Sequence, residues 1–145
     1  MPLWKQQLTP DDVNAMSRNT MMATLGIRIT EIGDDYVRGT MPVDARTHQP
    51  YGLLHGGASV TLAETLGSFA GMLTLDPVVE AAVGLDINAN HLRGVKSGIV
   101  TGTARPVHVG RSTQVWEIRI EDEHGKLVCI ARLTLAVIPS QLVAK

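Results

Sequence analysis

Apolar and polar residues alternate along most of the second half of the chain, and this alternation predicts strands. In residues 127–137 every second residue is apolar, and a period of two puts those side chains on one face of a strand. The same pattern predicts strands over residues 82–92, 98–107 and 115–120. Residues 123–126 have the composition of a turn, Glu-His-Gly-Lys. The last two strands are therefore expected to pair antiparallel.

A helical period replaces the alternation over residues 56–75. Apolar residues such as Leu62 and Leu66 recur there at intervals of three and four, which predicts one long helix. Gly67 and Gly71 lie on another face of it. Because glycine costs helix stability, two glycines in one helix indicate that a backbone or a sheet approaches closely.

The N-terminal part predicts a short helix and a hairpin. The helix covers residues 9–22, with Thr9 as its N-cap. Residues 25–43 alternate on both sides of a Gly-Asp-Asp turn, which predicts two paired strands. Residues 44–55 are expected to form a loop, and an Asp-Pro pair after residue 75 is expected to end the long helix.

The order of these elements indicates the fold class. A helix, two strands, a long apolar helix and three or four strands follow one another in a chain of 145 residues. An antiparallel sheet with the long helix buried against it, an α+β fold, satisfies this order in two layers. A doubly wound parallel sheet would need helical crossovers, which the later strands lack. The length suits a single domain spanning residues 1–145.

Composition excludes several function classes. The net charge is −1 and aromatic residues make up 3% of the chain, so neither nucleic acid nor an anionic membrane is an expected partner. Cys129 is the only cysteine and lies in an alternating apolar strand, which favours a core thiol. The absence of a disulfide pair and of an apolar leader predicts a cytoplasmic protein.

Glu64 is the only charged residue in the helix predicted over residues 56–75. An unpaired carboxylate in a buried helix is costly, so a functional role is one interpretation. The other is that Glu64 marks the solvated side of the helix, which Thr61, Thr65 and Ser68 would also line. Ser68 lies one turn beyond Glu64 on the same face and could orient the carboxylate or a water. Alternatively, Ser68 bonds back to a helix carbonyl.

A polar amide, an imidazole and two glycines come directly before this helix, at Gln49, His55, Gly56 and Gly57. A helix N-terminus has free N–H groups and a partial positive charge, and glycine lets a substrate approach the backbone. Such a position is suited to polarising a carbonyl oxygen as it becomes an oxyanion. His55 and Gln49 can add side-chain donors. The alternative is a tight loop in which the glycines serve only the turn.

Residues 87–116 contain no aspartate or glutamate, although basic residues are frequent there. A phosphate-rich ligand is one interpretation of this stretch, and a solvated basic strand face is the other. Alternation along the strands divides these side chains between two faces. Neither histidine spacing nor the lone cysteine matches a zinc motif, and no metal is expected. The basic residues are His91, Arg93, Lys96, Arg105, His108 and Arg111.

Three segments together resemble bacterial hotdog-fold thioesterases. They are residues 46–68, which contain the Gln…His-Gly-Gly…Glu…Ser spacing, residues 83–93 (VGLDINANHLR) and residues 108–111 (HVGR). The resemblance extends from Trp4 to Ile138. It points to the PaaI-like, Arthrobacter-type 4-hydroxybenzoyl-CoA thioesterase group. That group is close to the menaquinone-pathway 1,4-dihydroxy-2-naphthoyl-CoA thioesterase and the enterobactin proofreading thioesterase.

The resemblance implies a long helix wrapped by a curved antiparallel sheet, in dimers that pair into a homotetramer. It implies active sites at the dimer interface, where Gln49, His55 and the Gly56 N–H come from one protomer and Glu64 and Ser68 from its partner. The substrate would be an acyl- or aroyl-CoA thioester, or an acyl-carrier-protein thioester. Glu64 would act as general base or nucleophile, and no cofactor would be needed.

The resemblance also implies where the coenzyme A nucleotide binds. The residues expected near the nucleotide are His91, Arg93, His108, Gly110 and Arg111.

Two other functions remain open: a hotdog dehydratase or hydratase acting on acyl thioesters, and a non-catalytic acyl-CoA-binding protein. An intact Glu64 argues against the second.

Overall fold

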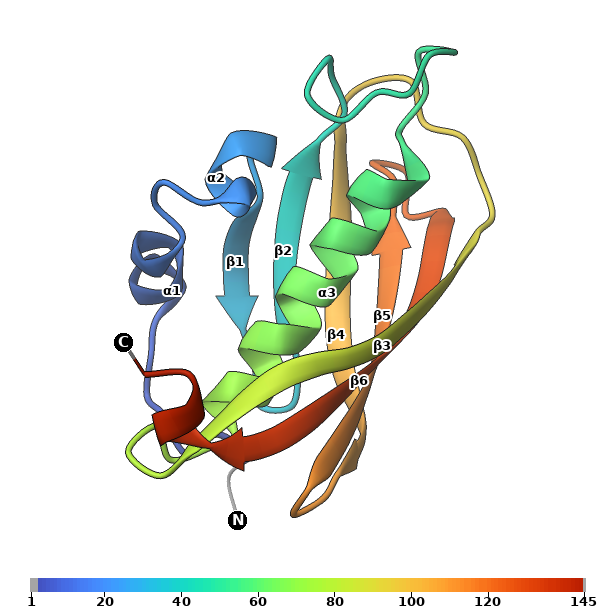
Figure 1. The fold of residues 1–145 in the computed structure, drawn as a ribbon. Helices are drawn as coiled ribbons and strands as arrows, with labels where there is room; N and C mark the ends of the chain where they lie inside the picture. The colour runs from blue at the N-terminus through green and yellow to red at the C-terminus, as the bar shows by residue number, and fades with distance from the viewer. Residues whose placement is uncertain (1–2, 145) are drawn as a thin grey trace.

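The chain folds as one six-stranded antiparallel sheet curled around a long helix, as the computed structural model of residues 3–144 shows (Figure 1). The strand order is β1-β2-β4-β5-β6-β3. This confirms the α+β architecture expected from the sequence. The helices are α1 (Pro10–Met16), α2 (Met21–Leu25) and α3 (Gly56–Leu73), and a 3₁₀ turn, η1, covers Ser140–Leu142. The strands are β1 (Arg28–Ile32), β2 (Val37–Pro42), β3 (Glu80–His91), β4 (Ile99–Val109), β5 (Thr113–Glu121) and β6 (Leu127–Pro139).

The core lies between α3 and the concave face of the sheet. Leu62 and Leu66 of α3 are fully buried there. A Cβ atom on Gly67 would lie 2.6 Å from Cδ2 of Leu133, and one on Gly71 would lie 2.8 Å from Oε1 of Gln114. The two glycines therefore let the helix approach the sheet closely, as predicted.

A buried polar network ties the C-terminal end of α3 to β5. The Gln114 amide donates to Oγ1 of Thr74 over 2.9 Å and accepts from Nε1 of Trp116 over 2.9 Å. Trp116 is fully buried and stacks on Trp4, with 6.2 Å between the ring centroids. Buried polar groups of this kind stabilise a fold only when all are bonded, so the position of Gln114 is tightly constrained.

We expect Gly71→Ala to lower the free energy of unfolding by about 1–3 kcal/mol. Alanine favours an exposed helix by about 1 kcal/mol over glycine, but here the added methyl group displaces the bonded Gln114 amide, and overpacking typically costs about 1–3 kcal/mol. Urea denaturation at fixed protein concentration measures the change. Gly67→Ala is the matched control, since the nearest atoms to its methyl group are apolar atoms of the Leu133 and Ile118 side chains and no hydrogen-bonded group. A more stable Gly71→Ala protein would contradict this account.

The single helix predicted over residues 9–22 is wrong. α1 ends at Met16 and α2 begins at Met21. Between them Asn19 adopts a left-handed conformation with φ 58°, which asparagine tolerates better than most residues. Thr20 donates its hydroxyl to the carbonyl of Ser17, so a local side-chain bond replaces a helical one. The N-cap prediction at Thr9 is confirmed by a capping box with Asp12.

The other boundaries differ by a few residues. α3 ends at Leu73 instead of residue 75, because Thr74 caps it by donating its hydroxyl to the carbonyl of Gly71. The predicted hairpin and the four later strands are all present, and β5 and β6 pair antiparallel as expected. Within residues 3–144 no helix is long and apolar enough to cross a membrane.

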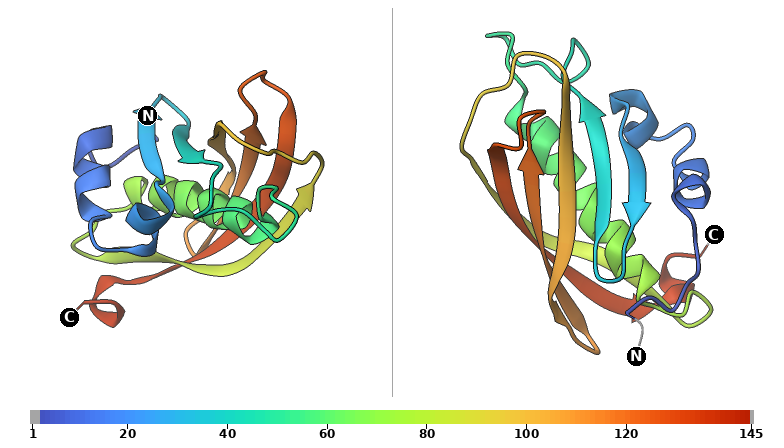
Figure 2. Two further views of the ribbon diagram at one scale, coloured as in Figure 1. Left: turned by 90° about the horizontal axis from the view of Figure 1, so that it is seen from above. Right: turned by 180° about the vertical axis from the view of Figure 1, so that it is seen from behind.

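The two edge strands of the sheet, β1 and β3, have different surroundings. At β1, Asn14 of α1 bonds both backbone groups of Ile29, each over 2.8 Å. The twelve-residue β3 has β6 on one side and ends the sheet on the other, as Figure 1 shows. Seen from behind, no helix crosses the outer face of the sheet (Figure 2). A long bare edge strand is a template for pairing with another chain.

Candidate active site

The loop before α3 presents hydrogen-bond donors at the helix N-terminus. His55 caps the helix, and its Nδ1 accepts from the Gly57 N–H over 2.8 Å. A neutral imidazole with an accepting Nδ1 carries its proton on Nε2. The His55 N–H donates to the carbonyl of the buried Thr47 over 2.7 Å, which holds the loop in place. The ring therefore has a donor left for a ligand.

The Gln49 side chain, like that of His55, has its acceptor bonded to a nearby backbone N–H. Its Oε1 accepts from the Tyr51 N–H, so the amide NH₂ is the group left to donate. The Gly56 N–H donates to no other residue of the described chain. Gln49 and Gly56 line one cavity of about 410 Å³. At the N-terminus of α3 the side-chain acceptors of His55 and Gln49 are therefore bonded within the protein, while their donors and the Gly56 N–H are free in the described chain. This arrangement suits a carbonyl oxygen that gains negative charge.

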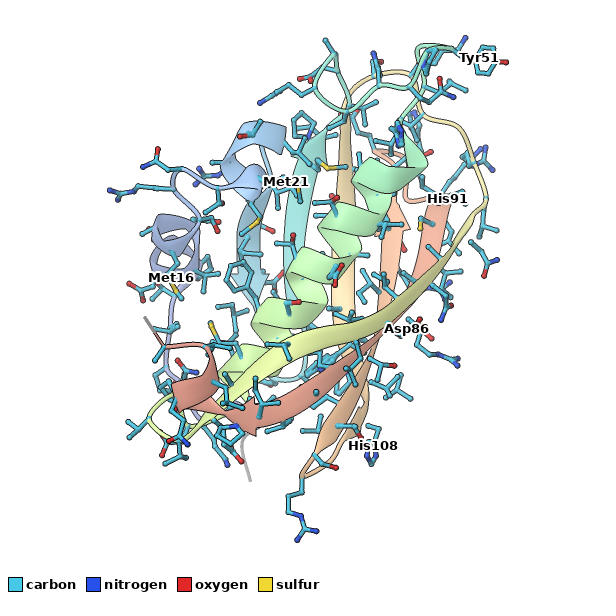
Figure 3. The ribbon with its side chains drawn as sticks, viewed as in Figure 1. Met16, Met21, Tyr51, Asp86, His91 and His108 are labelled. Carbon is cyan, nitrogen blue, oxygen red and sulfur yellow. The ribbon has the colours of Figure 1, made fainter. Side chains whose placement is uncertain are left out.

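His91 and Arg93 line the same cavity. A Cβ atom on Gly56 would lie 2.9 Å from Nε2 of His91, so the His91 ring lies directly against the helix N-terminus. β3 ends at His91, beside the first turn of α3, as Figure 3 shows. The structure therefore puts His91 beside the donors at the helix N-terminus as well as beside Arg93.

Glu64 projects from α3 into a different cavity, of about 1020 Å³. Its side chain is half-buried and forms no hydrogen bond or ion pair with any residue from 3 to 144. It points at β3, where a Cβ atom on Gly84 would lie 2.7 Å from Oε1 of Glu64. Gly84 is thus a site residue that sequence reasoning missed. The available signal was a glycine within an alternating strand, which often marks a close approach.

Ser68 lines the same cavity as Glu64. The hydroxyls of Thr61 and Thr65 bond back to helix carbonyls, over 2.9 Å to Gly57 and 2.7 Å to Thr61. The Ser68 hydroxyl makes no such bond in the described chain. Of these hydroxyls, only that of Ser68 is left to position a carboxylate or a water beside Glu64.

One chain does not bring Glu64 to the helix N-terminus. Gly56 and Glu64 lie on the same helix, and a rise of roughly 1.5 Å per residue separates them by about 12 Å along its axis. They also line separate cavities. A single chain therefore holds the donors and the carboxylate apart, at two separate cavities.

The basic residues of segment 87–116 also lie in separate parts of the structure. His108 lies near the end of β4, in the β4–β5 hairpin, at the end of the sheet opposite His91 (Figure 3). Gly110 and Arg111 belong to the same hairpin. Arg105 is elsewhere, paired with Asp35 over 2.8 Å. One chain therefore does not unite the residues expected to hold a nucleotide.

Two other expectations concern chemistry away from this site. Cys129 is fully buried, and burial raises the pKa of its thiol, which makes it a poor nucleophile. No group of three or more histidine, cysteine, aspartate or glutamate side chains within residues 3–144 is arranged to hold a metal ion.

Residues 51–129 match the family model described as the thioesterase superfamily. This match covers more than half of the chain. The chain belongs to the thioesterase superfamily, and its sheet and helix form the hotdog thioesterase fold. Membership supports thioester hydrolysis in general terms.

Relatives of this thioesterase-superfamily chain cover between 82% and 96% of its length. The putative esterase PA1618 of Pseudomonas aeruginosa is 53% identical over 96% of both chains. The solved structure of thioesterase HI1161 from Haemophilus influenzae is 53% identical, with a TM-score of 0.93 over 95% of this chain and 96% of that one. Two mutant structures of SAV0944 from Staphylococcus aureus are 39% and 38% identical, each with a TM-score of 0.80 over 82% of this chain and 98% of that one.

Proposed function

We propose that the protein hydrolyses acyl- or aroyl-CoA thioesters, with Glu64 as its catalytic carboxylate. The observation that carries this is the pairing of a half-buried, unpartnered carboxylate on α3 with a set of free donors at the N-terminus of the same helix. A thioester carbonyl needs both: donors for its oxygen and a base or nucleophile for its carbon.

The chemistry follows from these two halves. The Gly56 N–H, with Gln49 and His55 beside it, polarises the carbonyl oxygen. Glu64 then either takes a proton from a water, whose oxygen attacks the carbonyl carbon, or attacks that carbon itself to form an anhydride that water later opens. In both routes the carbon–sulfur bond breaks and the coenzyme A thiolate leaves. Ser68 orients the water or the carboxylate.

A dimer completes this site through a twofold axis. Gly56 and Glu64 lie symmetrically about Val60 on α3, so two antiparallel copies of α3 facing one another at Val60 put Gly56 beside the partner's Glu64. Within one chain Gly56 neighbours His91, and Glu64 neighbours Gly84. The same twofold axis therefore lies beside β3, midway between Gly84 and His91. Around this axis the bare edges of β3 in the two protomers pair antiparallel.

The same pairing gathers basic residues from both protomers. Thr113, the first residue of β5, and Val83 of β3 are both paired with Ala136 of β6. In the proposed dimer, Val83 would face the partner's Leu92. Three strand spacings, about 14 Å, then separate the β4–β5 hairpin from the partner's Arg93. Long side chains from both sides can reach one nucleotide. The hairpin contributes His108, Gly110 and Arg111. We further propose that two such dimers form a tetramer.

Substitutions made in SAV0944 support the choice of residues. One structure of that protein carries a glutamate-to-alanine replacement and the other a glutamine-to-alanine replacement. The two replaced positions are as far apart in that chain as Gln49 and Glu64 are here. A solved structure of thioesterase PA1618, 52% identical to this chain, carries the substitution Q49A.

The direct test is a panel of thioesters with the purified full-length protein. Release of free thiol from benzoyl-, octanoyl- and acetyl-CoA supports hydrolysis. Water addition to an enoyl-CoA, or its loss from a 3-hydroxyacyl-CoA, without thiol release would indicate the hotdog dehydratase or hydratase instead. Binding of these thioesters without turnover would indicate an acyl-CoA-binding protein.

We expect Arg93→Ala to raise KM for benzoyl-CoA at least about tenfold, because a charge-assisted phosphate contact contributes roughly 1.5–3 kcal/mol. The KM for benzoyl-N-acetylcysteamine, which lacks the nucleotide, should not change. Arg119→Ala, on the outer face of β5 beside Glu117, is the control and should leave both values unchanged. An equal rise for both substrates would remove Arg93 from the nucleotide site.

A further inference from the structure

The cavity beside Glu64 continues well beyond the reacting group. Glu64, Ser68 and Met72 all line it, and their four-residue spacing puts them in one stripe along α3. Met72 lies about 12 Å beyond Glu64 along the helix axis. The volume of about 1020 Å³ is far more than an acetyl group or a single aromatic ring occupies.

The walls of this groove are mainly apolar. Met21 and Met22 of α2 lie on one side, and the start of β3 and η1 lie on the other; Figure 3 labels Met21 on α2, beside α3. At the far end the Gln6 amide donates to the carbonyls of Met72 and Leu75, over 2.8 and 3.1 Å. The apolar lining includes Val60, Phe69, Leu75, Val78, Ala82 and Val143.

Several polar side chains in the groove bond within the protein. The Ser140 hydroxyl donates to the carbonyl of Val78 over 2.7 Å, and Thr65 bonds back to its own helix. Apart from Glu64, Glu80 at the start of β3 is the one charged residue among the described lining residues. Desolvation therefore favours a ligand that is apolar along this length.

We infer that this groove holds the acyl part of the substrate, that this part is an elongated apolar acyl group, and that Met72 limits its length. The inference rests on the proposed hydrolysis at Glu64, which puts the thioester carbon at the near end of the groove. An extended alkyl chain advances by about 1.25 Å per carbon, so roughly ten carbons reach Met72. Three flexible methionine side chains, at positions 21, 22 and 72, adapt the walls to different acyl groups.

The test is the dependence of kcat/KM on chain length, measured for straight-chain acyl-CoA thioesters with two to sixteen carbons. Each methylene that enters an apolar groove contributes a factor of about four. We expect kcat/KM to rise by about that factor per added methylene, until the chain reaches roughly ten carbons, and then to level off. Benzoyl- and 2-naphthoyl-CoA form a second arm, which tells whether a fused ring system fills the groove as an alkyl chain does.

Two substitutions of Met72 should move this limit in opposite directions. Met72→Trp is expected to lower kcat/KM for decanoyl-CoA at least about tenfold while leaving butanoyl-CoA unchanged, because the larger side chain blocks only the far part of the groove. Met72→Ala should extend the rise to longer chains. Met16→Trp is the matched control, since Met16 is 54% exposed on α1 and does not line the groove. Circular dichroism checks that each variant is folded.

A flat chain-length profile, or equal losses for butanoyl- and decanoyl-CoA in Met72→Trp, would overturn the inference. The same is true if Met16→Trp shifts the profile as Met72→Trp does. Calorimetric binding of the same thioesters separates this outcome from failure of the proposed function. Affinity that rises with chain length, without any hydrolysis, would support the groove and contradict the thioesterase proposal. Affinity independent of chain length would contradict the groove.

Discussion

Glu64→Gln will lower kcat for thioester hydrolysis by about a thousandfold or more and leave the fold and oligomeric state unchanged. The substitution keeps the shape of the side chain but removes the charge needed by both a general base and a nucleophile. General base catalysis contributes roughly 10²–10⁴-fold, and loss of a nucleophile costs at least as much. Because Glu64 makes no hydrogen bond or ion pair in the described chain, its neutral analogue leaves no group unsatisfied. Thiol release from benzoyl-CoA measures the effect.

Glu80→Gln is the matched control for this experiment. Glu80 is a second half-buried carboxylate on the lining of the same cavity, but it lies at the start of β3, away from the middle of the helix. Four strand residues, about 13 Å, separate Glu80 from Gly84 beside Glu64, and a benzoyl group does not extend that far along the groove. The neutral analogue should therefore keep kcat for benzoyl-CoA within about twofold of the unmodified protein. Retention of most activity in Glu64→Gln, or an equal loss in Glu80→Gln, would mean that Glu64 is not the catalytic carboxylate.

Single turnover in ¹⁸O-labelled water separates the two roles of Glu64. If Glu64 attacks the thioester, water opening the anhydride at the Glu64 carbonyl carbon leaves ¹⁸O on the protein. If Glu64 activates a water, the label appears only in the acid product. Mass spectrometry of the peptide that contains Glu64 distinguishes these outcomes.

Two inactive variants, Glu64→Ala and Gln49→Ala, will restore activity when their chains are combined in one dimer. If Glu64 of one protomer works with Gln49 of the other, each mixed dimer has one intact site and one site with both defects. Random association makes half of the dimers mixed, so the mixture should reach about a quarter of the unmodified activity. Each variant alone should be reduced at least about a hundredfold, since loss of one oxyanion donor costs roughly 10²–10³-fold.

The pair must be co-expressed with different affinity tags so that mixed dimers can be isolated. Co-expressed Glu64→Ala chains carrying the two tags serve as the control and should stay inactive. If the purified mixed dimer is no more active than its components, the site lies within one chain, and the twofold pairing through β3 is wrong.

Local patterns were sufficient for most of the fold. The strict alternation over residues 127–137 and the helical period of α3 each reflect one face of an element buried against the core, and both were confirmed. The break between α1 and α2 was missed, because it depends on a single residue, Asn19, that adopts a left-handed conformation. Intrinsic preferences are too weak to predict such a break within a short amphipathic segment.

Only part of the candidate site could be predicted from the sequence. Glu64 stands out because a charge in an apolar helix is unusual, and the loop donors stand out because glycines precede a helix. Gly84 was missed, since the space it leaves for Glu64 is created by a strand far along the chain. His91 was expected only near a nucleotide, and its contact with Gly56 depends on where β3 ends against α3.

Patterns in the sequence were enough to predict the α+β class, the long helix, the strand pairing at the C-terminal end, and residue types able to polarise a carbonyl oxygen. These follow from periodicity and chemistry, which are local. Three features became visible only in the folded chain: Glu64 and the Gly56 donors line separate cavities, Gly84 makes room for the carboxylate, and β3 leaves a bare edge. Such facts depend on how distant segments pack together, and no local pattern of residues encodes that packing.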